Sequence, residues 1–204
     1  MKKQERAART RSQLIAAAAD VFAENGFVRT NLVAVSQRAQ VSTGALHFHF
    51  ARKEDLAAAV VHEAVDGIRA ATGSAHRSPV CALQRLIDTS HAIAELLRTD
   101  SVVRAGVLLN QDGHGPQPDL HRKWHTHIKR LLTQAARENV LAPGLSRQSA
   151  AGVIKASTVG FEVLGRDDAA WLSRHTLASF WALHLPALAT DTALDKLEAG
   201  GSGV

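Results

Sequence analysis

The chain has 204 residues, of which 46% are apolar and 21% charged, a composition typical of globular rather than disordered or fibrous proteins. No apolar run approaches the roughly 20 residues of a membrane-spanning helix, and the first residues lack the apolar region of a signal peptide. The single cysteine, Cys81, excludes an intramolecular disulfide and a multi-cysteine metal site. We therefore expect a cytoplasmic protein without a membrane partner.

Positive charge is concentrated at the N-terminus. Residues 1–55 hold nine Lys and Arg against five Asp and Glu, and so supply +4 of the formal net charge of +5. A basic N-terminal quarter on a nearly neutral body indicates a module that faces a polyanion. A solvated charged surface and an anionic membrane surface are the alternatives at this point.

Apolar residues recur every three or four positions along the whole chain, which predicts an all-α protein of about nine or ten helices. The first helix is expected to end at Asn25–Gly26. Short helices follow over residues 32–39, capped by Asn31, and 43–50, after Ser42. A longer helix begins at Lys53 and dissolves near Gly73.

Five further helices are expected in the second part of the chain. They are centred on residues 83–97, 102–107, 120–135, 150–164 and 171–185, the last ending before Pro186. The glycine- and proline-containing segment 113–118 is predicted to be a loop, and the tail 198–204, rich in glycine and serine, is predicted to be disordered.

The order long helix, short helix, three-residue turn, short helix is typical of a helix-turn-helix. Thr43, Gly44 and His47 fall within about a 100° arc of the third helix. Thr43 and His47 can hydrogen-bond bases or phosphates, and Gly44 allows a close approach to a groove wall. The apolar residues of this helix are expected to anchor it to the first two; they are Ala45, Leu46, Phe48 and Phe50. A three-helix core without a DNA-binding role is the alternative.

Residues 10–56 contain T-R-x-x-L-I-x-A-A-x-x-x-F-x-x-x-G-F and, later, T-G-A-L-H-F-H-F-A-R-K-E-D-L. This segment resembles the DNA-binding domain of TetR-type transcriptional repressors. Within that family, the second block resembles the γ-butyrolactone autoregulator receptors of antibiotic-producing bacteria. Residues 100–109, the isolated Trp124 and residues 156–162 extend the resemblance over most of the chain.

The resemblance implies a homodimer with a helix-turn-helix DNA-binding domain over residues 1–52 and a ligand-binding and dimerisation domain over residues 53–197. Helices over residues 147–165 and 168–185 are expected to form a four-helix bundle between two subunits. The partners implied are a double-stranded DNA operator and a small-molecule effector, with no cofactor. The candidate DNA-binding residues are Asn31, Ser42, Thr43, Gly44, His47, His49 and Lys53, the last a phosphate contact. The family often carries Lys at position 43 and Tyr at position 47, so the operator sequence is not carried over.

Residue spacing also favours a ligand pocket in the second part of the chain. Trp124 lies four residues after Leu120 and four before Ile128, so its ring is expected to face the interior. Thr158 is a hydroxyl on an apolar face; it can bind a ligand oxygen or the carbonyl four residues back. By motif, Trp124 and Thr158 match the tryptophan and threonine that line the butyrolactone pocket. The candidate ligand-binding residues are Trp124, Thr158, Val61, Ile128 and Phe161.

One departure concerns the effector. Receptors of this type commonly carry Gln where this chain has Ala64. Together with the basic isoelectric point of about 9.9, the departure resembles the pseudo-receptor branch, which answers to other small molecules, antibiotics among them. The sequence thus predicts a repressor released by a γ-butyrolactone-like molecule or an antibiotic pathway product, controlling secondary metabolism.

Histidine spacing supports a second, different class of function. His121 and His125 lie four residues apart on one predicted helix, with His114 nearby, and this spacing can seat Zn²⁺ or Ni²⁺ in a metal-responsive regulator or a metal-binding protein. Catalysis is not expected, because no nucleophile elbow, triad or carboxylate pair occurs in a suitable context.

Overall fold

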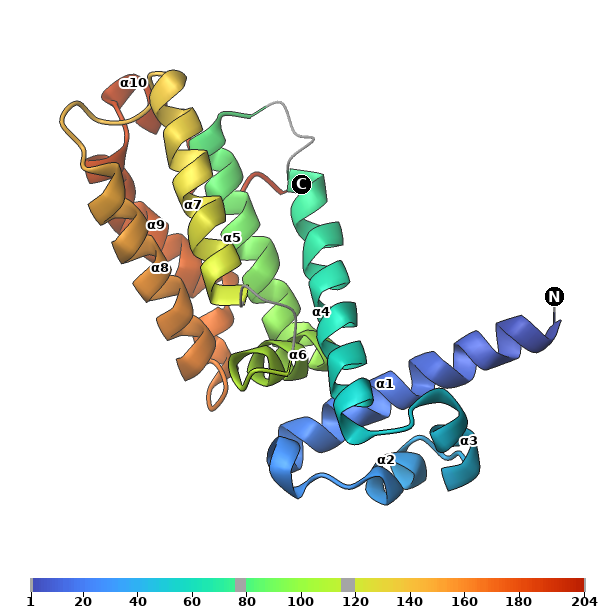
Figure 1. Ribbon diagram of the computed structural model, residues 1–204. Helices are drawn as coiled ribbons and strands as arrows, with labels where there is room; N and C mark the ends of the chain where they lie inside the picture. Colours follow the sequence, from blue (N-terminus) through green and yellow to red (C-terminus); the bar gives the residue numbers. More distant parts are fainter. Residues whose placement is uncertain (1, 76–79, 115–119, 204) are drawn as a thin grey trace. The chain divides into compact units, whose positions relative to one another are not determined.

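The computed structural model describes residues 2–75, 80–114 and 120–203, and these are helical as expected (Figure 1). The elements are α1 (Lys2–Arg29), α2 (Leu32–Arg38), α3 (Thr43–His49), α4 (Lys53–Ala75), α5 (Ala82–Thr99), α6 (Ser101–Gln111), α7 (Leu120–Arg137), α8 (Arg147–Leu164), η1 (Ala169–Leu172), α9 (Arg174–Leu188) and α10 (Asp191–Leu194). Over the described ranges, no helix has the length and apolar character needed to cross a membrane. Most of the predicted loop 113–118 lies outside the described residues.

The chain divides into two compact units. The first comprises residues 1–68 and 100–120, and the second comprises residues 69–99 and 121–204. The boundary after residue 52 between a DNA-binding and a ligand-binding domain is a functional division and stays a prediction. The first part of α4 and the whole of α6 join the helix-turn-helix, because α6 packs against α1 and supplies buried Ala105 and Leu109 to the same apolar core.

Local sequence features set the bounds of the first three helices. Gly26 interrupts α1 with φ of +69°, and one further turn continues to Arg29. Asn31 caps α2, its Oδ1 accepting from the amide of Ala34 at 2.8 Å. Ser42 caps α3 in the same way. The predicted bounds of α2 and α3 are confirmed to within one residue.

Helices α4 and α6 approach each other closely at Gly106. A Cβ atom at this position would collide with the Cβ atom of Ala64 and lie 3.2 Å from the carbonyl oxygen of Val60. Ala64 itself is fully buried. A glutamine at position 64 would therefore have to separate the two helices, so the small residue at 64 and the glycine at 106 belong to one packing arrangement.

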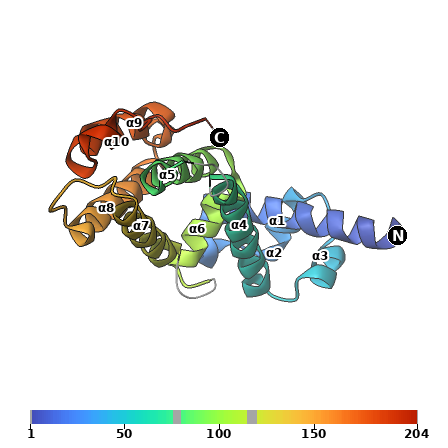
Figure 2. The same ribbon diagram turned by 90° about the horizontal axis from the view of Figure 1, so that it is seen from above.

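The second unit is built around α5, α7, α8 and α9, which lie side by side in both views (Figures 1 and 2). Trp181 of α9 is fully buried, and its indole Nε1 donates to Ser90 Oγ of α5 at 2.8 Å. The predicted end of α9 before Pro186 is wrong, since the helix runs to Leu188. Pro186 lies in the last turn, where its missing amide proton removes only one helical hydrogen bond.

The tail also differs from the expected disorder. Described residues 198–203 are held by hydrogen bonds to Gln84, Asp88 and His91 of α5 and to Arg174 of α9. Gly201 is buried within this segment. A segment rich in glycine and serine is flexible only when no other part of the protein binds it. Here side chains more than 20 residues away in sequence bind the segment.

Gln40, in the turn between α2 and α3, has a left-handed backbone with φ of 54°. This conformation costs a residue with a Cβ atom about 1–2 kcal/mol, and the extra chain entropy of glycine offsets about 0.5–1 kcal/mol of that. We therefore expect Gln40→Gly to raise the free energy of unfolding by about 0.5–1 kcal/mol, measured by urea denaturation. Asn139→Gly is the matched control, because Asn139 has φ of 55° but asparagine tolerates this region better. An equal or larger gain from Asn139→Gly would contradict the explanation.

Candidate functional site

Helix α3 presents an exposed face made of Thr43, Gly44, His47 and Phe48. The first three were predicted to lie there. Phe48 was expected to anchor the helix, and this is wrong: its side chain is 81% exposed, whereas Leu46 and Phe50 are buried. Phe48 follows Gly44 by four residues and therefore shares its face, so the spacing contained the signal. We call these four residues the reading face.

The two helix caps beside the reading face retain groups that can bind phosphate. Asn31 uses Oδ1 on the amide of Ala34, which leaves its Nδ2 donors available, and Asn31 is exposed. Ser42 accepts from the amide of Ala45 at 3.1 Å, which leaves its hydroxyl proton available. Both residues can therefore fix a helix end and donate to an anion at the same time. His49 is half-buried, with its ring edge-on to Phe48.

Lys53 has a structural role that the sequence did not predict. Its Nζ donates to the carbonyl oxygens of Phe27, Val28 and Thr30 at 2.8, 3.1 and 2.9 Å. The same ammonium lies 4.5 Å from the centroid of the Phe27 ring. Three carbonyls satisfy the three donors of a lysine, so Lys53 fastens the end of α1 to the start of α4. A phosphate contact by Lys53 would require exchange of one of these bonds and stays a prediction.

The exposed cations of the N-terminal part of α1 remain available to an anion. Arg6, Arg9 and Arg11 are all exposed. The guanidinium carbon of Arg11 lies over the ring of Phe50, 5.3 Å from its centroid. These three residues are better phosphate candidates than Lys53.

Two predicted ligand-site residues bind each other. The indole Nε1 of Trp124 on α7 donates to Thr158 Oγ1 on α8 at 2.8 Å. Thr158 in turn donates to the carbonyl of Ile154 at 2.8 Å, the backbone bond that was the alternative to a ligand. Trp124 is half-buried against the apolar core of the second unit. The seam between α7 and α8 thus holds an indole N–H and a hydroxyl, both satisfied internally.

One turn further along the seam lies a buried carboxylate. Glu162 of α8, 8% exposed, accepts from His121 Nε2 of α7 at 2.9 Å and from the guanidinium of Arg166. Burial raises the pKa of Glu162, but the hydrogen bonds from His121 and Arg166 outweigh it, and the pKa lies below its ordinary value. The ionised form of Glu162 therefore helps to join α7 to α8 at neutral pH.

The other predicted ligand residues fall into both units. Ile128 is fully buried in the core of the second unit, and half-buried Phe161 packs against the same core. The Phe161 ring stacks on Trp171 with centroids 6.4 Å apart. Val61 is fully buried in the core of the first unit. Trp124, Thr158, Ile128 and Phe161 therefore belong together, and Val61 belongs to a different core.

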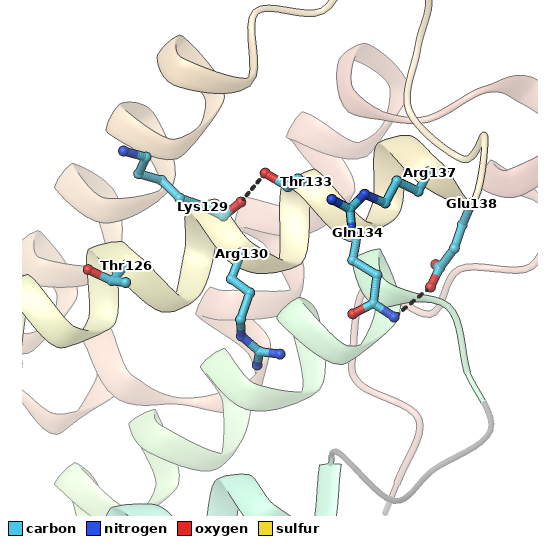
Figure 3. A pocket seen from close by; sticks show the side chains of 7 residues that line it. All are labelled: Thr126, Lys129, Arg130, Thr133, Gln134, Arg137 and Glu138. Carbon is cyan, nitrogen blue, oxygen red and sulfur yellow. Dashed lines mark hydrogen bonds between the residues drawn. The ribbon is translucent and has the colours of Figure 1, made fainter.

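A hollow lies along α7 (Figure 3). Its walls are polar side chains of this helix and the residue after it: Thr126, Lys129, Arg130, Thr133, Gln134, Arg137 and Glu138. A site that one helix lines cannot enclose an apolar ligand, because such ligands bind in concave, mostly apolar pockets. It shares no residue with the predicted ligand site.

Two of the histidines proposed as metal ligands have other partners, each within its own unit. His114 stacks on the ring of Phe27 in the first unit, with centroids 3.6 Å apart, whereas His121 donates to Glu162 in the second. Among the described residues, no three His, Cys, Asp or Glu side chains are placed to hold a metal ion. His125 has a buried Nδ1 without a hydrogen-bond partner. The described part of the chain therefore offers no site for the metal-responsive alternative.

A helix-turn-helix with a free reading face, joined to a second helical unit, defines the class of protein: a DNA-binding transcription regulator. Residues 14–60 match the model of bacterial regulatory proteins of the tetR family. The chain belongs to the tetR family. It is a regulator and not an enzyme, since the matching family consists of regulatory proteins and one relative is an HTH-type transcriptional regulator.

Individual relatives show which members the chain is similar to. It is 32% identical over 193 residues to the A-factor receptor protein of Streptomyces griseus, covering 93% of this chain and 67% of the relative. A crystal structure of a γ-butyrolactone receptor, an ArpA-like protein, matches with a TM-score of 0.81 and 28% identity, over 94% of both chains. CprB of Streptomyces coelicolor, solved with its biological operator sequence, matches with a TM-score of 0.78 and 29% identity, also over 94% of both chains.

Proposed function

We propose that this protein is a homodimeric repressor that binds a pseudo-palindromic operator in the cytoplasm and is released by a small, mostly apolar signalling molecule. The effector class is γ-butyrolactone-like or an antibiotic pathway product, and the regulated process is secondary metabolism. The exposed reading face of α3 is the observation that carries the DNA-binding part. Similarity to the A-factor receptor and to γ-butyrolactone receptors supports the effector class.

The reading face is proposed to lie in the major groove. His47 and Thr43 donate to base edges, and exposed Phe48 adds an apolar surface suited to the methyl group of thymine. Asn31, Ser42 and the exposed arginines of α1 contact phosphates. Two such faces in a dimer read half-sites separated by about one helical turn or a multiple of it.

The test begins with footprinting on the DNA upstream of the protein's own gene. With about 6–10 phosphate contacts, operator affinity should fall by roughly 10³–10⁵ between 50 and 200 mM salt. Fluorescence anisotropy of the footprinted fragment measures this change. Equal affinities at the two salt concentrations would contradict phosphate anchoring.

Apolar side chains remain exposed on α8, η1 and α9, which supports a dimer through these elements. On α8 they are Val153, Val163 and Leu164, exposed by 45–48%. Trp171 of η1 is 41% exposed and Leu183 of α9 is 77% exposed. Groups of exposed apolar side chains typically mark interaction sites. Two copies of such a face can cover each other.

We expect Leu183→Glu to break this dimer. The side chain is 77% exposed, so the substitution does not disturb the core, but it places a carboxylate inside the proposed interface, where an unpaired charge is costly. Sedimentation velocity should show a dissociation constant raised at least 10-fold, and operator affinity should fall with it. Thr133→Glu, an exposed change on α7, is the control. A dimeric Leu183→Glu protein would contradict the placement of the interface.

A further inference from the structure

The described C-terminal residues 198–203 bind a row of side chains on α5. Gln84, Asp88 and His91 are four and three residues apart, so they lie along one face of the helix. Gln84 and Asp88 are only 3% and 7% exposed. Polar groups buried to this degree require hydrogen-bond partners. Both views show the end of the chain returning to α5 (Figures 1 and 2).

The first hydrogen bonds of this row are made to backbone groups of the segment. Gln84 pairs with both backbone groups of Glu198: Oε1 accepts from the amide at 2.8 Å, and Nε2 donates to the carbonyl at 3.2 Å. His91 donates from Nε2 to the carbonyl of Ala199 at 2.9 Å. A carbonyl only accepts, so Nε2 carries the proton. Burial lowers the pKa of His91, which favours this neutral form.

Arg174, the first residue of α9, extends the same pattern. Its Nε donates to the carbonyl of Gly200 at 2.7 Å, and its Nη2 donates to the carbonyl of Gly201 at 3.1 Å. Each of the four successive carbonyls of residues 198–201 therefore accepts from a side chain of α5 or α9. Recognition of this kind fixes the path of a peptide whatever its side chains are.

Two positions add selectivity for the peptide sequence. Ser202 donates to both oxygens of Asp88, from its amide to Oδ1 and from its hydroxyl to Oδ2, each at 2.8 Å. Gly201 has φ of +81°, and a Cβ atom there would lie 3.4 Å from His91 and 3.5 Å from Asp88. These distances are ordinary contacts, so it is the left-handed backbone that glycine fits better than any other residue. The row thus selects glycine followed by a hydroxyl residue.

We propose that Gln84, Asp88, His91 and Arg174 form a peptide-binding site, the α5 peptide site, whose ligand is a segment of the type Ala-Gly-Gly-Ser and whose occupant is the segment 198–203 of this same chain. Seven hydrogen bonds from the site hold the segment. The ordering entropy of a glycine-rich segment opposes them. The segment is therefore a releasable strap that joins α5 to the start of α9, and a free peptide of the same sequence can replace it.

Hydrogen exchange on the full-length protein tests the occupant. Residues 198–203 of the wild type should exchange at least 10-fold more slowly than the same sequence as a free peptide, followed by mass spectrometry. Gly201→Val should abolish this protection, and Ser202→Ala should reduce it. Lys196→Ala is the control, since Lys196 is exposed and lies outside the site. Unprotected wild-type residues, or protection unchanged in Gly201→Val, would overturn the proposal.

Binding in trans tests the site itself. A synthetic peptide of residues 196–204 is titrated by calorimetry into the full-length Gly201→Val protein, whose own strap is displaced. Saturable one-to-one binding is expected, and a peptide carrying the same glycine-to-valine change should bind at least 10-fold more weakly. Adding Asp88→Ala to the protein should remove binding of the wild-type peptide. Absence of binding to a folded Gly201→Val protein, or equal binding of the two peptides, would overturn the proposal. None of these measurements involves DNA or the effector.

Discussion

Replacing Gly44 by leucine should abolish operator binding while making the free protein slightly more stable. The position is open in the protein, with Ser42 Oγ, 4.0 Å from a built Cβ atom, as its nearest neighbour. Glycine costs a helix about 1 kcal/mol relative to leucine, so the free energy of unfolding should rise by up to about 1 kcal/mol. Against DNA, the new side chain would occupy the space that the groove wall needs, and operator affinity should fall at least 100-fold.

The opposite signs of the two effects make this test specific. Gly73→Leu is the matched control, because Gly73 lies in α4 with nothing within 4 Å of a built Cβ atom but outside the reading face. It should gain similar stability and keep operator affinity within about twofold. Denaturant unfolding and anisotropy titration on the two variants provide the comparison. A Gly44→Leu protein that binds the operator normally would place DNA contact on another face.

The helix-turn-helix could be predicted from sequence because its determinants are local. Asn31 and Ser42 cap α2 and α3 through amides three residues away, and spacing alone orients Thr43, Gly44 and His47 on one face. Phe48 is apolar but 81% exposed, so its spacing from Gly44, and not its apolar character, predicts its position. A 7-residue helix is too short to bury all its apolar side chains on one side.

The structural features that the sequence did not predict depend on contacts between residues distant in sequence. The carbonyl partners of Lys53 lie 23 to 26 residues before it, and those of Gln84 lie 114 residues after it. No periodicity or motif encodes such pairs, so the role of Lys53 and the order of the tail were both missed. The bond between Trp124 and Thr158 spans 34 residues; spacing and the family resemblance predict both as pocket residues, but neither predicts that they bind each other.

The second large effect concerns Trp124, and Trp181 serves as its matched control. Trp124 and Trp181 each donate from Nε1 to a hydroxyl at 2.8 Å, Thr158 and Ser90 respectively. Each hydroxyl then donates to a backbone carbonyl of its own helix. The two differ in burial, because Trp181 is fully buried and Trp124 is half-buried. The proposed ligand would replace Thr158 as the acceptor of the Trp124 indole N–H, whereas fully buried Trp181 is closed to solvent.

We therefore expect Trp124→Phe to leave operator affinity within about threefold of the wild type and to remove release by a synthetic γ-butyrolactone or by organic culture extracts. The variant keeps an aromatic ring and loses one hydrogen bond, so the free energy of unfolding should fall by only about 0.5–1.5 kcal/mol. Coupling between effector and operator of about 1–3 kcal/mol corresponds to a 5–150-fold response, and this response should disappear.

Trp181→Phe is the control. It should lose at least as much stability, because it leaves a buried hydroxyl with one partner fewer, and the variant should still be released from the operator. Melting temperature, operator affinity and release measured on both variants separate a pocket wall from a core residue. If Trp124→Phe is released normally, or if Trp181→Phe loses release to the same degree, Trp124 is part of the core and the effector binds elsewhere.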